Sequence, residues 1–159
     1  MFSRKLLKKS RFLFFLLGAA FLVALVQGVG GDEEAPPRLK TARVELLGRF
    51  YTLELARTPS QRREGLMHRK SLATDAGMLF VFEQSGYYRI WMKNTWIPLT
   101  VVWVDDSETV VGVKQLQPCT GDPCPTYGVD AAAKYIIEFS LENNHFKPGD
   151  YLPELKSLR

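Results

Sequence analysis

Short runs of β-forming residues, separated by turn residues, are the feature that most constrains the fold of this chain. Gly48 and Arg49 separate two such runs, and a polar turn at 105–108 separates two others. Runs of this length between turns are typical of strands that pair with their neighbours. We expect strands at 44–47, 50–56, 77–82, 87–92, 100–105, 109–116 and 134–141. The sequence therefore predicts a mainly β fold of the α+β kind, with a small antiparallel sheet that curls toward a barrel or sandwich.

One short helix is expected among these strands, within residues 58–67. Thr58 is a good N-cap, Pro59 suits the first helical position, and Gln61 can close a capping box. The sequence therefore predicts a single helix of about two turns between the second and third strands.

Residues 1–30 carry the features of an export signal. Five Lys or Arg residues fall within the first eleven positions, and an apolar segment without a charge follows at 12–26. A basic segment before an apolar one is typical of a signal peptide. Extended to Gly30, the apolar segment is also long enough to span a bilayer. We expect an exported protein, periplasmic or extracellular, either secreted after cleavage or tethered to the membrane by residues 12–30.

The rest of the chain is predicted to hold one working domain. Residues 31–38 combine acidic side chains with two prolines and indicate a solvated linker, which leaves 39–156 as a single β-rich domain. The net charge of +4 comes from the N-terminal segment, because subtracting its five basic residues from 21 leaves 16 Lys or Arg against 17 Asp or Glu. This balance argues against nucleic-acid binding, and membrane contact is expected only through the N-terminal segment.

Trp91, Lys93, Asn94 and Thr95 form the densest group of residues suited to binding. Lys93 could hold a carboxylate or phosphate, Asn94 and Thr95 could orient it, and the indole could supply a flat apolar wall. The alternative interpretation is a polar turn beside core tryptophans.

Arg62, Arg63 and Arg69 form a second candidate group for binding an anion. Arg62 and Arg69 lie seven residues apart and share one face if the helix continues through Gly65. Two guanidinium groups on one face could clamp an anion. The alternative is a solvated face, or ion pairs with acids such as Glu64 and Asp75.

Cys119 and Cys124 are the only cysteines of the chain, and prolines border them. In an exported domain such a pair predicts a disulfide that closes a short loop. Zinc binding is less favoured, since it would need both His68 and His145 as further ligands. We therefore expect no metal site, and no cofactor is predicted.

These patterns leave three classes of function open. The leading hypothesis is an extracytoplasmic domain that binds a small anionic or carboxylate-bearing ligand. The second is an envelope hydrolase or transferase with Lys93 or Asp105 as base and Tyr127 assisting. The third is a protein-interaction module that uses an edge strand. The sequence does not decide whether the protein is an enzyme, and it does not predict the oligomeric state.

Several segments, in this order, resemble a known family, the domain of unknown function number 192. The segments are TPSQRREGLMHRKSL (58–72), GMLFVF (77–82), WMKNTWIPL (91–99), CTGDPCPTY (119–127), YIIEF (135–139) and KPGD (147–150). The resemblance covers about 58–152 and implies a small β-rich domain, often exported, for which no activity is agreed.

The same resemblance implies which residues are signature positions. They are Arg62, Gly65, Met67, Arg69, Met78, Trp91, Lys93, Asn94, Thr95 and Pro98. The family pattern usually continues with an aspartate where this chain has Thr100. A carboxylate acting there as a base or a cation ligand would be absent here. The resemblance therefore implies a shared scaffold and shared binding more than a shared catalytic role.

Overall fold

The computed structural model describes residues 39–159, and the predictions for the signal segment 1–30 and the linker 31–38 lie outside the described residues. The described part is mainly β, as expected. Its elements are β1 (Thr41–Leu46), β2 (Arg49–Ala56), α2 (Pro59–Glu64), β3 (Ala76–Gly86), β4 (Ile90–Trp91), β5 (Leu99–Val104), β6 (Val110–Leu116), β7 (Thr126–Tyr127), β8 (Ala133–Ser140) and the 3-10 helix η1 (Pro153–Leu158). Among these residues, none of the helices has the length and apolar character that a membrane span requires.

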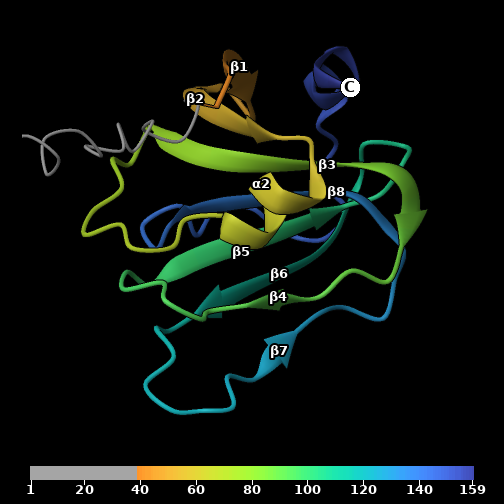
Figure 1. Cartoon of the computed structure of the whole chain (residues 1–159). Helices are drawn as coiled ribbons and strands as arrows, with labels where there is room; N and C mark the ends of the chain where they lie inside the picture. Colours follow the sequence, from red (N-terminus) through yellow and green to blue (C-terminus); the bar gives the residue numbers. More distant parts are fainter. Residues whose placement is uncertain (1–38) are drawn as a thin grey trace, which may run out of the picture. The chain divides into compact units, whose positions relative to one another are not determined.

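Six strands form one curled, open sheet in the order β1-β2-β3-β8-β5-β6 (Figure 1), and β4 pairs with β7 in a separate ribbon. Every neighbouring pair is antiparallel except β2 and β3, which run parallel. The sheet is therefore mixed, where we predicted an antiparallel one. The reason is that residues 57–75, which include α2, lead the chain back to the end of the sheet at which β2 began. Strand β3 therefore starts beside the start of β2 and runs parallel to it.

The helix start follows the predicted capping box. The Thr58 hydroxyl accepts a hydrogen bond from the Gln61 backbone N–H at 3.2 Å, and the Gln61 side chain accepts one from the Thr58 N–H at 3.0 Å. The α-helix ends at Glu64, earlier than the predicted limit of 67, because Gly65 takes a φ of +51° that ends the helical path.

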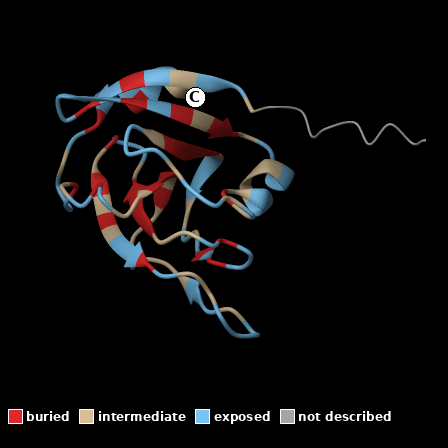
Figure 2. Ribbon diagram, turned by 90° about the vertical axis from the view of Figure 1, so that its left-hand side faces the viewer, coloured by how far each residue is buried: buried red, intermediate tan, exposed pale blue. Residues whose placement is uncertain are grey.

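The sheet buries side chains on both faces, in two separate apolar clusters. In Figure 2 the buried residues, coloured red, lie mostly along the strands. We call the first the C-terminal face, because Phe146, Leu152 and Leu155 pack onto its strands. We call the second the helix face, because Leu66, just after α2, packs there together with Ile90 and Met92. Apolar side chains alternate between the two faces along the central strands, as the two-residue period of a strand requires.

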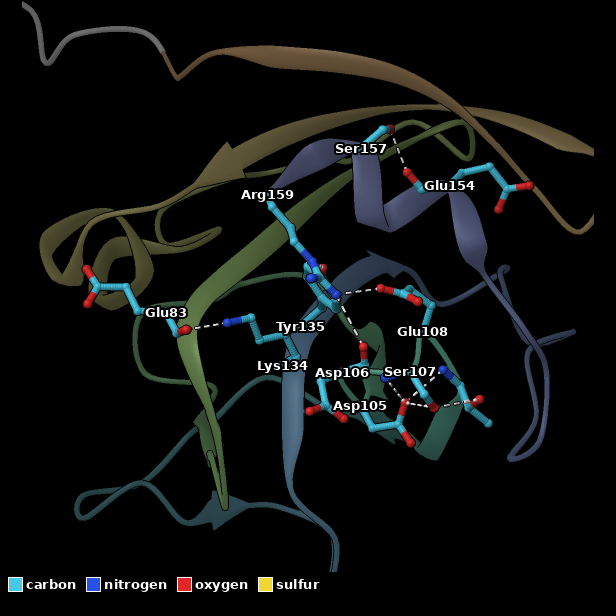
Figure 3. A network of polar contacts seen from close by, with 11 residues as sticks. Glu83, Asp105, Asp106, Ser107, Glu108, Lys134, Tyr135, Glu154, Ser157 and Arg159 are labelled. Atoms are coloured by element: carbon cyan, nitrogen blue, oxygen red, sulfur yellow. Dashed lines mark hydrogen bonds and ion pairs between the residues drawn. The ribbon is translucent and has the colours of Figure 1, made fainter.

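The end of the chain is fastened to the C-terminal face by Arg159 (Figure 3). Its Nε donates to the hydroxyl of buried Tyr135 at 2.6 Å, and its Nη2 donates to the buried carboxylate of Glu108 at 2.6 Å and to the Asp106 carbonyl at 3.2 Å. These bonds join η1 to strand β8 and to the turn between β5 and β6.

Cys119 and Cys124 form the predicted disulfide, with Cα atoms 5.9 Å apart. The bond closes the loop between β6 and β7. A disulfide fits an extracytoplasmic location, because thiols in the cytoplasm are kept reduced.

Candidate binding pocket

A pocket of about 290 Å³ opens on the helix face, between α2, the segment that leads into β4, and the sheet. This volume lies at the small end of the range for ligand sites. Buried Phe80 from β3 and buried Glu138 from β8 form its base. The pocket therefore combines residues from four separate parts of the chain, 59–67, 80–82, 88–95 and residue 138.

Gly65 keeps the base of the pocket accessible. A Cβ atom at this position would lie 3.4 Å from Phe80 Cζ and 3.7 Å from Glu138 Oε2, so the backbone after α2 runs directly past both groups. The φ of +51° at Gly65 is one that side-chain-bearing residues rarely adopt. A glycine is thus required here by the backbone path.

Aromatic rings line much of the remaining wall. Phe82 and Tyr88 stack with ring centroids 3.6 Å apart and an interplanar angle of 10°. Trp91 lines the pocket with 39% of its surface exposed. Such a wall suits a flat or apolar ligand body.

Charged side chains surround the mouth of the pocket, with three guanidinium groups against the one carboxylate of Glu64. Arg62 Nη1 donates to the Arg57 carbonyl at 2.6 Å and to the Val81 carbonyl at 3.0 Å, so this nitrogen is committed to the fold. Arg89 is held by two hydrogen bonds to Thr126. The Arg63 side chain makes no hydrogen bond or ion pair within residues 39–159 and is exposed. The mouth is therefore positively charged, and the guanidinium group of Arg63 has no partner among residues 39–159.

Glu138 is the most unusual group of the pocket. It lies in a row across the helix face, paired with Met78 on one side and Val101 on the other, and is only 4% exposed. No hydrogen bond or ion pair within residues 39–159 involves its side chain. Burial raises the pKa of Glu138 to about 8, although the positive charge of Arg69 opposes the shift. At neutral pH the carboxyl group is mostly protonated and can donate a hydrogen bond.

The structure brings together three of the six predicted binding residues. Arg62, Trp91 and Thr95 line the pocket, whereas Arg69 and Lys93 are not among its lining residues. Arg69 instead forms a two-bond ion pair with Glu54, at 2.5 and 2.8 Å. The Nζ atom of Lys93 lies 5.6 Å from the centroid of the Trp91 ring.

Asn94, the sixth predicted residue, lies in a turn outside the pocket lining. It has a φ of +55°, and its carbonyl accepts a hydrogen bond from the His68 N–H at 2.8 Å. Thr95 is buried, and its hydroxyl donates to the Lys93 carbonyl at 3.4 Å. The 93–95 segment thus has the polar-turn geometry of the alternative interpretation, while Thr95 also reaches the pocket.

The residues considered for catalysis lie elsewhere. Thr100 pairs with Phe139 on the C-terminal face, and its hydroxyl donates to the Leu141 carbonyl at 3.2 Å. The position of the family's usual aspartate therefore faces away from the pocket. Asp105 caps its own turn by accepting hydrogen bonds from Ser107 and Thr109. Tyr127 belongs to β7.

Sequence reasoning missed most of the pocket. The unforeseen lining residues with polar or aromatic side chains are Glu64, Phe80, Phe82, Tyr88, Arg89 and Glu138, whereas Arg63 belonged to the second candidate group. One sequence feature could have identified Glu138, because it is the only acid in the otherwise apolar run YIIEF. A carboxylate within a buried strand is a functional candidate by its burial alone.

The fold and the pocket define a small β-rich domain with a buried carboxyl group in an arginine-rimmed cavity. Residues 42–152 match the family DUF192, described as an uncharacterized ACR, and the chain belongs to this family. This confirms the resemblance inferred from the sequence motifs.

Two solved structures are similar to this chain. One is a putative transcription regulator from Sinorhizobium meliloti, 29% identical, with a TM-score of 0.57 over 70% of this chain and 88% of that one. The other is a protein of unknown function from Novosphingobium aromaticivorans, 26% identical, with a TM-score of 0.62 over 71% of this chain and 84% of that one. Among curated proteins there is no significant match.

Proposed function

We propose that this protein is an extracytoplasmic domain that binds a small carboxylate-bearing ligand in the pocket over Glu138. The observation that carries the proposal is the combination of an aromatic wall with a mouth rich in guanidinium groups. An apolar body can rest against the rings of Phe80 and Trp91, while the carboxylate pairs with Arg63. The pocket volume limits the ligand to a small molecule.

The positive mouth favours an anion over a neutral ligand. Three arginines outnumber the single acid Glu64 there. Arg63 is the main contributor, because its side chain has no other partner among the described residues. Arg62 keeps Nη2 and Nε for a ligand while Nη1 holds its position. A carboxylate would therefore meet the Arg63 guanidinium, which has no other partner among the described residues, beside that of Arg62, which the fold already holds in place.

Calorimetric titration with straight-chain carboxylates from acetate to octanoate tests the proposal. We expect saturable binding that strengthens with chain length until the pocket is filled, because each methylene group buries further apolar surface. Arg63→Gln should weaken binding about threefold to tenfold. Lys114→Gln, which removes an exposed charge on edge strand β6, is the matched control and should bind normally. Absence of binding across the series, or equal affinity in the Arg63 variant, would contradict the proposal.

The proposed location rests on two observations. The basic and apolar segments of residues 1–30 have the pattern of an export signal, and the disulfide suits an oxidising compartment. Fractionation of producing cells, followed by intact-mass measurement, tests this directly. We expect the protein outside the cytoplasm, with a mass two hydrogen atoms below that of the reduced chain. A reduced protein in the cytoplasmic fraction would contradict the proposed location.

A further inference from the structure

We propose that the ligand carries an amine as well as a carboxylate, and that the amine is bound by Glu138 at the base of the pocket. This inference rests on the proposed function and narrows its ligand class to small amino carboxylates. It is carried by the arrangement of charge along the pocket, with cationic groups at the exposed mouth and a single carboxyl group in the buried base.

The base of the pocket has the composition of an ammonium site. The carboxyl of Glu138 and the ring of Phe80 both line the base of the pocket, and each approaches the position of a Gly65 Cβ atom within 4 Å. Trp91 and Tyr88 also line the pocket, and aromatic faces attract cations. A carboxylate next to aromatic rings offers an ammonium group both an ion pair and a cation–π contact.

Glu138 is available for this role because the fold makes no other use of its carboxyl group. Arg69, whose positive charge acts on Glu138, is already paired through two bonds with Glu54. A buried carboxyl group without a partner is costly, and proteins keep such groups mainly at functional sites. An ammonium group on the ligand would supply the missing partner.

The charged environment of Glu138 comes from several elements. Helix α2 contributes Arg62, Arg63 and Glu64, the following loop contributes Arg69, and the segment before β4 contributes Tyr88 and Arg89. Strands β3 and β5 place only apolar residues, Met78 and Val101, beside it. The empty pocket therefore holds Glu138 mostly in its neutral form at pH 7, with a pKa of about 8. Binding of an ammonium group would favour the ionised form and release a proton.

Matched pairs of ligands test this inference. Butanoate, pentanoate and hexanoate are titrated beside 4-aminobutanoate, 5-aminopentanoate and 6-aminohexanoate at pH 9. We expect at least one amino carboxylate to bind at least about tenfold more tightly than its matched carboxylate, as a charge-assisted contact allows. Glu138→Gln should remove that advantage, so that each amino carboxylate binds the variant no more tightly than its matched carboxylate does.

Proton release supplies a readout that needs no variant. Titration of the wild-type protein at pH 7, in two buffers with different ionisation enthalpies, should show close to one proton released for each amino carboxylate bound, and none for its matched carboxylate. If the carboxylates bind and the amino carboxylates are no tighter, or release no proton, this inference fails while the proposed function stands. If neither series binds, both fail.

Discussion

The Oε2 atom of Glu138 lies 3.7 Å from the point where Gly65 would carry a Cβ atom. One residue comes from the end of the only α-helix within residues 39–159, and the other comes from a central strand. Both residues line the pocket, so the turn after α2 passes close to the buried carboxyl group at its base.

Gly65→Ala is expected to destabilise the protein. The φ of +51° strains any residue with a Cβ atom, which costs about 1–3 kcal/mol in the free energy of unfolding. Urea denaturation measures the loss. The control is Gly121→Ala, where no heavy atom lies within 4 Å and no unusual φ is required. Equal stability of the two variants would refute the backbone argument.

Glu138 should make stability depend on pH. Its pKa is raised from 4.5 to about 8 in the folded protein, so protonation favours folding. This contribution is complete below pH 4.5 and is lost as the pH rises through about 8. A shift of this size corresponds to roughly 5 kcal/mol at most. Compared with Glu138→Gln, the wild-type protein should lose stability between pH 5 and 9, measured by denaturation at each pH. Parallel profiles for the two proteins would show that Glu138 titrates normally.

Arg69 is expected to tune the acidity of Glu138 without touching the pocket. Its positive charge lowers the pKa of Glu138, so Arg69→Gln should raise that pKa further above its ordinary value. A carbon-13 NMR titration of the glutamate carboxyl groups measures the change. Because the side chains of Arg69 and Glu54 are 32% and 26% exposed, loss of their ion pair should cost no more than about 1 kcal/mol. Glu54→Gln is the control for that loss, and an unchanged Glu138 titration in the Arg69 variant would contradict the assignment.

Gly112 on β6 should tolerate no side chain. A Cβ atom there would stand 2.3 Å from Cγ1 of Val129, in the segment that follows β7. Gly112→Ala should therefore lower the free energy of unfolding by about 1–3 kcal/mol. The double variant Gly112→Ala/Val129→Ala should recover part of that loss, since it removes the clashing methyl group. A double variant less stable than the single one would show that the clash is not the cause.

Arg159 should contribute to thermal stability although it is the last residue. Its removal leaves the buried carboxylate of Glu108 and the hydroxyl of Tyr135 without their partner. Arg159→Ala should lower the melting temperature. Lys156→Ala, at an exposed position of η1, should leave it nearly unchanged. Scanning calorimetry compares the two, and equal melting temperatures would mean that the Arg159 contacts drawn in Figure 3 add no stability.

Local patterns predicted the local structure well. The capping residues Thr58 and Gln61 start a helix where expected, and most predicted strands exist. The Tyr87–Met92 strand was too long, since only Ile90 and Trp91 pair with a neighbour. The direction of strand pairing could not be predicted from local sequence patterns, because the parallel pairing of β2 with β3 depends on how the intervening segment packs.

The pocket was only partly predictable, because it also depends on how segments distant in the sequence pack together. Arg62 and Trp91 were recognisable as residue types that bind ligands, and both line the pocket. Lys93 was expected beside them, but the turn at Asn94 leaves it over the Trp91 ring. Glu138 becomes a pocket residue through pairing between strands that are distant in the sequence, and no spacing rule along the chain reveals such a contact.

A crystal structure of the protein grown with excess hexanoate tests the central claim most directly. The account predicts electron density for the ligand in the Glu138 pocket, with its carboxylate within hydrogen-bond distance of Arg63 and its chain against Phe80 and Trp91. Density for hexanoate only at other surfaces, or a pocket that stays free of it at saturating concentration, would contradict the assignment of this pocket as the binding site.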